Sequence, residues 1–232
     1  MRYIGTAGWS IPPNSTETGT RLARYSSTLP CVEINSTFYR AHRPKTWQKW
    51  AAETPEHFRF AIKAPRSITH EAKLRGVQIL LEGFLGQIEP LKEKAGPLLF
   101  QLPPSFEFDP ALAEDFIGLL RSIYGKEVAF EPRHRSWFTA EASARLKTEG
   151  IARVAADPPK GAPQASDPGG DLSLAYYRLH GSPQTYYSSY SDDFLRSLVD
   201  STSALQNTWI IFDNTALGHA YNNALYLKSL MR

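Results

Sequence analysis

The sequence is poor in sulfur and has no long apolar run. Its single cysteine, Cys31, cannot form an internal disulfide bond, and we expect it to be a small buried residue of an apolar segment. No stretch approaches the roughly 20 apolar residues of a membrane span. The opening residues, MRYIGTAGW, lack the basic region and apolar run of a signal peptide. These absences predict a cytoplasmic protein without a membrane segment.

A large excess of one charge is also absent. Lys and Arg number 26 against 23 Asp and Glu, which gives a formal net charge of +3. Proteins that bind nucleic acid along many phosphates usually carry a stronger basic excess. We therefore do not expect a nucleic-acid partner, although composition alone leaves one open.

Short signature motifs for metals and dinucleotides are missing as well. The chain contains neither HExxH nor a paired CxxC. The sequence GTAGW at 5–9 lacks the third glycine of a dinucleotide-binding loop. No cofactor is predicted on these grounds.

The chain does contain a regular series of short apolar segments. Eight of them predict β-strands, at residues 3–7, 32–36, 58–64, 97–102, 127–131, 151–157, 174–180 and 208–213. Nearly continuous apolar runs are typical of strands covered on both faces, as in parallel sheets. The intervals between the segments are long enough for a crossover helix between successive parallel strands.

Helical patterns fill most of those intervals. We predict helices at residues 44–53, 80–95, 109–124, 139–149, 191–207 and 216–231, and Asp109, Thr139 and Ser191 are suitable N-caps. The segment 158–171, PPKGAPQASDPGGD, instead predicts a loop. The pattern favours an α/β fold, a single (β/α)8 TIM barrel over residues 1–232 with the sixth helix short or replaced by a loop. An open doubly wound sheet is the alternative.

Polar side chains stand at the end of every predicted strand after the first. Alternation along a strand places them on the same face as small or apolar residues of the presumed interior. They are Glu33, Asn35, Lys63, Gln101, Glu131, Arg133, Asp157, Arg178, His180 and Asp213, and Asn214 follows the last of them. Functional sites of parallel barrels lie at this end, so we expect these side chains to line a binding site.

Five of these side chains suggest particular chemistry. Glu131 and His180 are candidates for general acid/base catalysis. Lys63 would be a catalytic Schiff-base nucleophile if it were desolvated, and otherwise a salt-bridged cation. Arg133 and Arg178 are candidates for clamping a phosphate or carboxylate.

Loops after the strands supply further candidates for the pocket. His70 follows the third predicted strand, and His134 follows the fifth. Tyr39, Trp137 and Tyr187 also lie on such loops, where an aromatic ring can stack on a sugar or another ring or pack the rim of the barrel.

The polar strand ends also fit a structural network or a metal site. The carboxylates and cations could form an ion-pair network that fills the end of the barrel, although buried ion pairs stabilise a fold less than apolar packing does. The acidic residues and His180 have the side-chain types that bind Mn, Mg or Zn. The interleaved Arg and Lys would repel a cation, so no metal site is predicted.

Several motifs together resemble the DUF72 (YecE-like) family of uncharacterised proteins. They are IGTAGW (4–9), VEINSTFYR (32–40), FRFAIKAPRSITH (58–70), GPLLFQLPPSF (96–106), FEPRHRSWF (130–138), YYRLHG (176–181) and FDNTALGHAYNNAL (212–225). The resemblance implies a TIM barrel whose pocket contains Glu33, Asn35, Lys63, Glu131, Arg133, His134, Arg178 and His180. It implies no particular reaction, because none is agreed for the family.

Three functional hypotheses follow. The leading one is an enzyme that uses acid/base chemistry on a small anionic or sugar-like molecule, as a lyase, isomerase or hydrolase. The second is a divalent-metal-dependent phosphoesterase or nuclease on a related barrel. The third is a binding module without catalysis that recognises a metabolite or nucleic acid. The sequence leaves the oligomeric state open.

Overall fold

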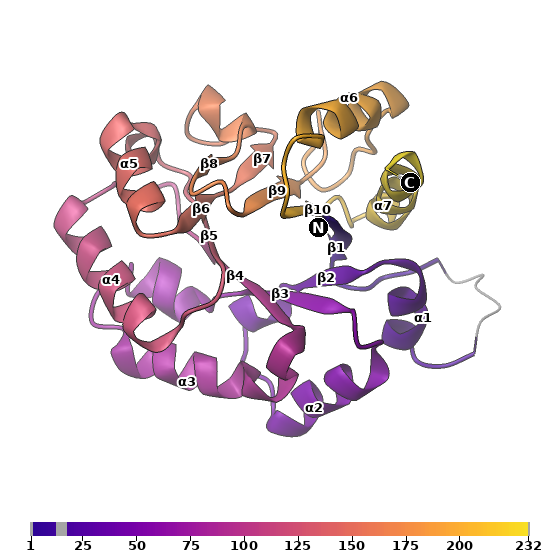
Figure 1. Cartoon of the computed structure of the whole chain (residues 1–232), viewed down its shortest axis with the longest axis horizontal. Coiled ribbons are helices and arrows are strands. Elements are labelled where there is room, and N and C mark those ends of the chain that lie inside the picture. The colour runs from indigo at the N-terminus through magenta and orange to yellow at the C-terminus, as the bar shows by residue number, and fades with distance from the viewer. Residues whose placement is uncertain (1, 13–17, 232) are drawn as a thin grey trace.

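The computed structural model describes residues 2–12 and 18–231, and it contains a barrel-like sheet surrounded by helices (Figure 1). The strands are β1 (Arg2–Ala7), β2 (Cys31–Ile34), β3 (Arg59–Lys63), β4 (Ala95–Gln101), β5 (Val128–Glu131), β6 (Ile151–Arg153), β7 (Ala155–Asp157), β8 (Gly169–Gly170), β9 (Ala175–Leu179) and β10 (Thr208–Phe212). Each predicted strand region overlaps at least one of them.

The sheet is nearly closed. Its strand order is β7-β9-β10-β1-β2-β3-β4-β5-β6-β8, and every pairing is parallel except that of β8 with β6. β6 pairs with β5, whereas β7 pairs with β9. Only Val154 separates β6 from β7, and its N–H donates to the carbonyl of Phe130 at 2.8 Å. β6 and β7 thus join opposite ends of the strand order through consecutive residues of one chain segment, which brings the sheet close to closure.

Helices cover the outer face of this sheet (Figure 1). They are α1 (Arg21–Thr28), α2 (Pro44–Glu53), α3 (Gln78–Ile88), α4 (Pro110–Ile123), α5 (Ala140–Thr148), α6 (Asp192–Thr202) and α7 (His219–Leu230). The three predicted N-caps are confirmed: the side chains of Asp109, Thr139 and Ser191 each accept a backbone N–H of the following turn.

Two helical regions differ from the sequence prediction. Helix α1 has no counterpart in it; this helix is short and begins after Thr20, whose side chain accepts the N–H of Ala23. The predicted helix 80–95 ends at Ile88, because Pro90 lacks the N–H that would continue it. A 3₁₀ segment (Glu89–Lys94) leads from there into β4. Residues 158–171, predicted as a loop, contain a 3₁₀ turn (Pro163–Ser166) and β8.

Apolar side chains form two layers, one on each face of the sheet. Val32 and Ile34 belong to the outer layer, between strands and helices, as the alternation predicts. The inner layer fills the barrel and consists of Cys31, Ala61, Leu99, Ala129, Ala152, Val154, Leu174, Tyr176, Trp209 and Ile211. Tyr3, Trp209 and Tyr176 stack one on the next within it. The apolar layer fills the rest of the barrel interior, and the polar side chains occupy the end at which the parallel strands finish.

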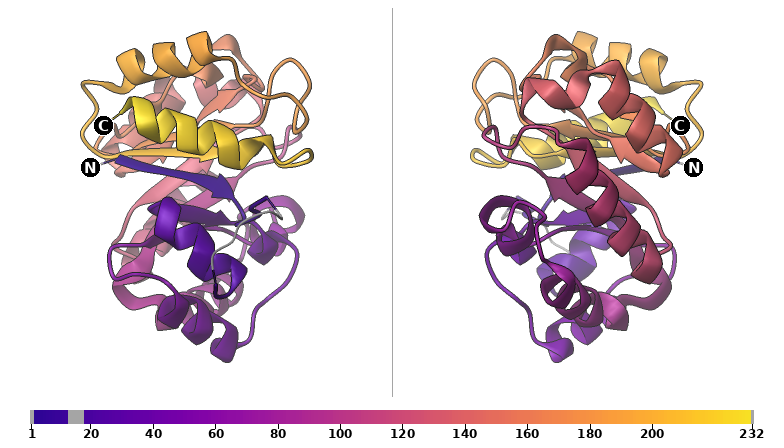
Figure 2. Two further views of the ribbon diagram at one scale, coloured as in Figure 1. Left: turned by 90° about the vertical axis from the view of Figure 1, so that its right-hand side faces the viewer. Right: turned by 90° about the vertical axis from the view of Figure 1, so that its left-hand side faces the viewer.

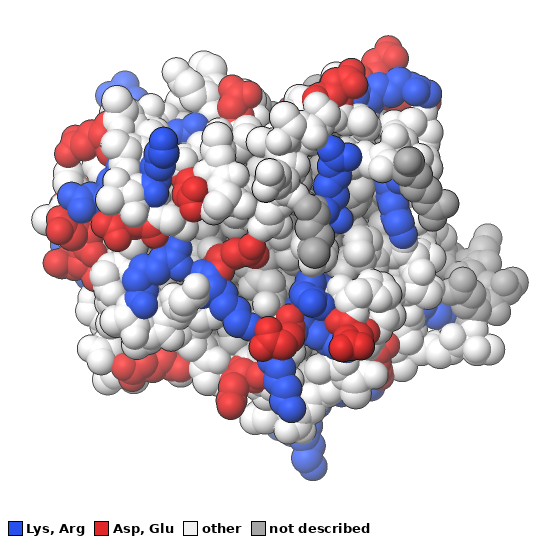
Figure 3. Space-filling view, viewed as in Figure 1, with Lys and Arg blue, Asp and Glu red and all other residues white. Residues whose placement is uncertain are grey.

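The beginning of β1 and the end of α7 both lie where the strands begin, and the arrowhead of β1 points to the opposite end (Figure 2). Lys and Arg are interspersed with Asp and Glu on the face shown in Figure 3. Within the described residues, no helix combines the length and apolar character that crossing a membrane requires.

Candidate functional site

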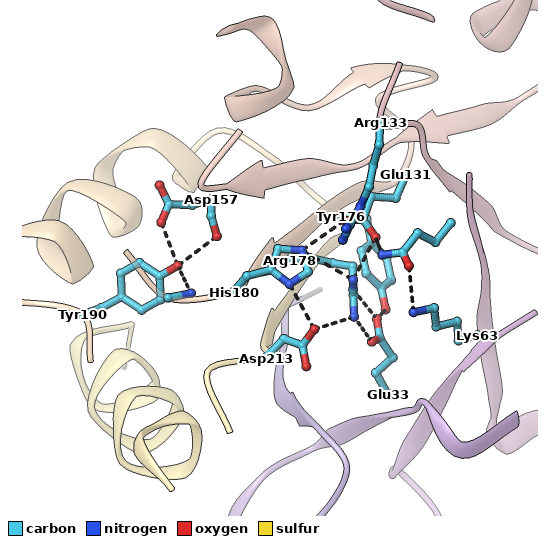
Figure 4. A network of polar contacts seen from close by, with 12 residues as sticks. Glu33, Lys63, Glu131, Arg133, Asp157, Tyr176, Arg178, His180, Tyr190 and Asp213 are labelled. Carbon is cyan, nitrogen blue, oxygen red and sulfur yellow. Dashed lines mark hydrogen bonds and ion pairs between the residues drawn. The ribbon is translucent and has the colours of Figure 1, made fainter. Parts of the chain in front are cut away.

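Arg178, near the end of β9, is the centre of the polar network at the carboxyl end of the strands (Figure 4). Its Nη2 donates to Glu33 Oε1 at 2.7 Å and to Asp213 Oδ2 at 3.0 Å. Its Nε donates to Glu33 Oε2 at 3.1 Å, and its Nη1 donates to Glu131 Oε2 at 2.8 Å. The side chain is 1% exposed, and four of the five N–H groups of its guanidinium donate to three carboxylates, so most of its donors are occupied by the protein itself.

Glu33 is held by Tyr176, from the barrel interior, as well as by Arg178. It lies in β2, one residue before the end of that strand, and is completely buried. The hydroxyl of Tyr176 donates to its Oε2 at 2.8 Å. Through this bond the charged network rests on the aromatic stack that fills the barrel.

His180 bridges two carboxylates. Its Nε2 lies 3.0 Å from Glu131 Oε1, and its Nδ1 lies 3.0 Å from Asp213 Oδ2. Burial and then Arg178 act to lower the pKa of His180, but the hydrogen bonds to the two carboxylates outweigh them and raise it. A protonated imidazole donates from both nitrogens, which suits this geometry.

Glu131 joins the two parts of the network. It accepts from Arg178 and Gln101 on Oε2, and it contacts Arg133 and His180 through Oε1. Burial alone would raise its pKa, yet Arg178 above all, with His180 and Arg133, holds the pKa of this carboxyl well below its usual range. Burial would also raise the pKa of Asp213, but Arg178 first, then His180 and Lys63, lower it. Neither carboxylate takes up a proton readily near neutral pH.

Lys63, at the end of β3, is held very differently. Its Nζ donates to Gln101 Oε1 at 3.0 Å and lies 4.3 Å from the centre of the Phe38 ring. Among the residues that the structure describes, no carboxylate forms an ion pair with it. Burial and Arg178 lower the pKa of Lys63 to about 8, although Glu131, Glu33 and Asp213 act in the opposite direction.

Arg133 and His70 complete this second part. Arg133 donates to Glu131 Oε1 at 3.2 Å through Nη2, and its buried Nε has no partner within the described part of the chain. His70 lies on a π-helical turn (Ser67–Glu71) and contacts the Phe38 ring edge-on at 4.9 Å. Burial, Lys63 and Arg133 lower the pKa of His70.

The network thus has two halves. The closed half is Glu33, Tyr176, Arg178, His180 and Asp213, in which donors and acceptors are matched. The open half is Lys63, His70, Gln101 and Arg133, which has N–H groups to spare. Glu131 belongs to both. Three cationic side chains (Lys63, Arg133 and Arg178) face three carboxylates (Glu33, Glu131 and Asp213), and two of those carboxylates also raise the pKa of His180.

Asp157 does not face this network, which corrects the alternation assumed along residues 151–157. Val154 lies in the inner apolar layer, but Ala155 lies in the outer one. The change of pairing partner at Val154 therefore reverses the faces of β7 relative to the prediction. The Asp157 carboxylate accepts the Tyr190 hydroxyl at 2.7 Å, apart from Arg178 and its partners (Figure 4).

Three further predicted pocket residues have structural contacts instead. Trp137 is 1% exposed, packs among aromatic rings and donates to the carbonyl of Phe106 at 2.9 Å, so it is a core residue. His134 caps a 3₁₀ turn (Arg135–Phe138) through its Nδ1. Asn214 is buried and donates to the Ser188 carbonyl and to Asn223, so it ties a loop to α7.

The remaining predicted residues lie at the periphery. Asn35 follows β2 and precedes a 3₁₀ turn (Ser36–Phe38), with its Oδ1 buried and without a partner in the described structure. Tyr39 is 75% exposed and Tyr187 is 47% exposed. Phe38 is a site residue that the prediction lacks, although its position between a polar strand end and Tyr39 within VEINSTFYR was a usable signal.

No group of three or more His, Cys, Asp or Glu side chains in the described residues is arranged to hold a metal ion. Glu33, Glu131 and Asp213, which the sequence suggests as possible ligands, are instead paired with Arg178 or His180. Asp157 accepts the Tyr190 hydroxyl.

The sequence matches a family model described as "Protein of unknown function DUF72" over residues 3–232. It is 25% identical to the UPF0759 protein YunF of Bacillus subtilis over 267 residues, which covers 100% of this chain and 95% of that protein. It is 32% identical to the UPF0759 protein YecE of Escherichia coli K12 over 152 residues, which covers 65% of this chain and 55% of the relative.

Solved structures with the same fold carry the same family description. A DUF72 family protein from Thermotoga maritima superposes with a TM-score of 0.78 at 27% identity, covering 100% of this chain and 99% of the other. A DUF72 family protein from Enterococcus faecalis superposes with a TM-score of 0.81 at 21% identity, covering 100% and 95%. The second likeness concerns the fold alone.

Proposed function

The chain belongs to the DUF72 family, whose function is unknown, and we propose that it is an enzyme acting by acid/base chemistry on a small anionic or sugar-like molecule. The molecule binds at the carboxyl ends of the strands, beside the open half of the network. We further interpret the fold as a (β/α)8 barrel in which β6 and β7 together form one interrupted strand.

The observation that carries this proposal is the unmatched cationic side of the site. Lys63 donates to a neutral amide, and Arg133 shares a carboxylate with three other groups. A buried cation without a carboxylate is costly for a fold, whereas an incoming anion would pair with it. The lack of a carboxylate partner for Lys63 among the described residues and the unused N–H of Arg133 Nε favour a phosphate or carboxylate as the recognised group.

Proton transfer is assigned to the open half as well. Lys63 and His70 both have lowered pKa values, so each can exist in its neutral form near physiological pH. Glu131 and His180, the candidates from sequence, are each held between oppositely charged partners. In this proposal Glu131 orients Gln101 and Arg133, and His180 holds Glu131 in place. Exposed Tyr39 and Tyr187 are available to stack on a sugar ring.

Ligand binding tests the recognition part of this proposal. Phosphate, sulfate, acetate and glucose 6-phosphate, with glucose as the uncharged match, would be compared by thermal shift and calorimetry. At least one anion should bind, and Arg133→Gln and Lys63→Met should each weaken it about tenfold, the usual effect of losing a charge-assisted hydrogen bond. His134→Gln is the matched control, because His134 caps a turn through Nδ1 and its Nε2 faces the exposed Glu107.

Turnover tests the enzymatic part. Each anion that binds would be incubated with the protein and followed by proton NMR, with Lys63→Met as the inactive comparison. Binding without any chemical change across such anions would point to the binding module instead. Binding that is unaffected by Arg133→Gln would place the anion elsewhere and refute the assignment of the open half.

A further inference from the structure

Lys63 combines features that a salt-bridged lysine lacks. The residue is 8% exposed, and its ammonium group reaches one hydrogen-bond acceptor, the amide oxygen of Gln101. The Phe38 ring covers another side of the nitrogen at 4.3 Å. When Lys63 loses its proton, the amine keeps an N–H for Gln101 and gains a free lone pair.

We propose that Lys63 is a nucleophilic amine that forms a Schiff base with a small carbonyl compound carrying an anionic group. This inference rests on the proposed function, because it places the anion of that substrate against Arg133. It adds the class of the reacting group, a ketone or aldehyde, and a covalent intermediate.

The surroundings favour the reaction over a merely structural lysine. Burial and the nearby Arg178 disfavour the charged form, against the opposing carboxylates Glu131, Glu33 and Asp213. With a pKa of about 8, roughly one molecule in ten carries a neutral Lys63 at pH 7. A desolvated amine beside another cation is the usual way in which proteins activate a lysine toward carbonyls.

The second group needed is a positive charge that can hold the substrate's anion. Arg133 meets this need, since it is linked to Lys63 by only two intervening side chains. Lys63 Nζ lies 3.0 Å from Gln101 Oε1, Gln101 Nε2 lies 2.7 Å from Glu131 Oε2, and Arg133 Nη2 lies 3.2 Å from Glu131 Oε1. The Arg133 side chain is 21% exposed, which leaves part of it accessible to a ligand.

The step balances without an added oxidant or reductant. The lone pair of the neutral amine attacks the carbonyl carbon, and the C=O bond becomes a C–O single bond of a carbinolamine. The two hydrogens of the amine leave with that oxygen as one molecule of water, while a C=N bond forms. His70, which contacts the same Phe38 ring as Lys63, is suited to take up the proton that the attacking nitrogen releases and to pass it to the departing hydroxyl.

Reductive trapping tests this proposal. The intact protein would be treated with pyruvate or dihydroxyacetone phosphate in the presence of cyanoborohydride, and the modified residue mapped by mass spectrometry. Acetone and dihydroxyacetone serve as uncharged matches. We expect one reduced adduct, located on Lys63, with at least one of the two anionic probes. The two probes differ in the distance between carbonyl and anion, so their relative yields report that spacing.

Three variants make the result specific. Lys63→Arg keeps the charge and should abolish the adduct, whereas Lys49→Arg should leave it unchanged because Lys49 is an exposed partner of Glu53. Arg133→Gln should reduce trapping of the anionic probe about tenfold but leave that of its uncharged match similar. Trapping by the natural sequence should also rise with pH through 8, which needs no variant that might misfold.

The outcomes separate the two proposals. Anion binding as proposed above without an adduct on Lys63 would overturn the Schiff base and leave the proposed function standing. Adducts spread evenly over surface lysines would overturn it too. If neither anion binding nor an adduct occurs, both proposals fall. An adduct on Lys63 that does not depend on Arg133 would overturn the stated place of the anion.

Discussion

The closed and open halves of the network have similar side chains but different pairing. In the closed half, Arg178 directs its guanidinium to Glu33, Glu131 and Asp213, and His180 joins two of the same carboxylates. In the open half, Lys63 has an amide as its hydrogen-bond partner and Arg133 has one carboxylate that it shares. Both halves are largely buried, so exposure does not account for the difference.

The difference separates residues that build a site from residues that are free to act in it. A charge whose partners are all supplied by the protein contributes to a rigid frame, because releasing any one partner leaves another unpaired. A charge without such partners keeps its capacity for a ligand. We therefore expect a structural role and a ligand-binding role to belong to different residues of the same network.

Removing Arg178 should have the largest effect on stability. Arg178→Met leaves three buried carboxylates without their common partner, and breaking a buried ion pair of this kind costs about 3–5 kcal/mol. Urea unfolding would measure the loss. Arg66→Met is the control, since the Arg66–Glu71 pair is exposed and such pairs contribute about 0–1 kcal/mol. Similar losses for the two variants would abolish the distinction between the halves.

The lowered pKa of Lys63 should make the free energy of unfolding depend on pH. Its pKa is about 8 in the folded protein and near 10.5 when unfolded, so between these values the unfolded chain binds a proton that the folded chain lacks. The free energy of unfolding then rises with pH. This rise is absent from Lys63→Met, and the difference should reach the order of 2 kcal/mol.

Urea unfolding of both proteins at pH 7 and pH 10 would measure that rise. The other titrating groups of the network largely cancel in the difference. The depressed pKa values of Glu131 and Asp213 act below pH 4.5, and the raised pKa of His180 stabilises below pH 6.5 and fades as pH rises through its folded value. Lys49→Met provides the exposed control. If the free energies of unfolding of the natural sequence and of Lys63→Met differed by the same amount at pH 7 and pH 10, Lys63 would be as well paired as Arg178.

The strand ends that share the network could be predicted because parallel strands end at the same edge and their side chains alternate. Glu33, Lys63 and Gln101 were placed on the inner face in this way. Asp157 was misplaced, because nothing in the residues IARVAAD signals that pairing changes from one neighbouring strand to another at Val154.

The sequence also could not predict that the network divides into a closed half and an open half. Arg133 and Arg178 looked equivalent as anion clamps, and only the contacts of each guanidinium distinguish them. Trp137 likewise resembled a rim residue, since its motif does not disclose that Phe106 and Phe130 pack around it. Composition and spacing identify which residue types meet, whereas pairing depends on side-chain geometry from strands far apart in the chain.

Removing the Tyr176 hydroxyl from the closed half should have the smallest effect on stability. Tyr176→Phe removes the hydroxyl that donates to Glu33 Oε2 at 2.8 Å, but Arg178 still holds both oxygens of that carboxylate. The expected loss is about 1 kcal/mol in urea unfolding, the usual net contribution of one hydrogen bond. Tyr177→Phe, on the outer face of the same strand, is the matched control and should cost less.

Tyr176→Phe should also leave anion binding by the open half unchanged, because Glu33 contacts neither Lys63 nor Arg133 directly. A loss of stability together with unchanged binding is the signature of a frame residue. If calorimetry showed instead that the anion binds tenfold more weakly to Tyr176→Phe, the aromatic stack would be coupled to the ligand through Glu33 and Arg178. The two halves would then act as a single unit, with matched pairing on one side setting the orientation of Glu131 on the other.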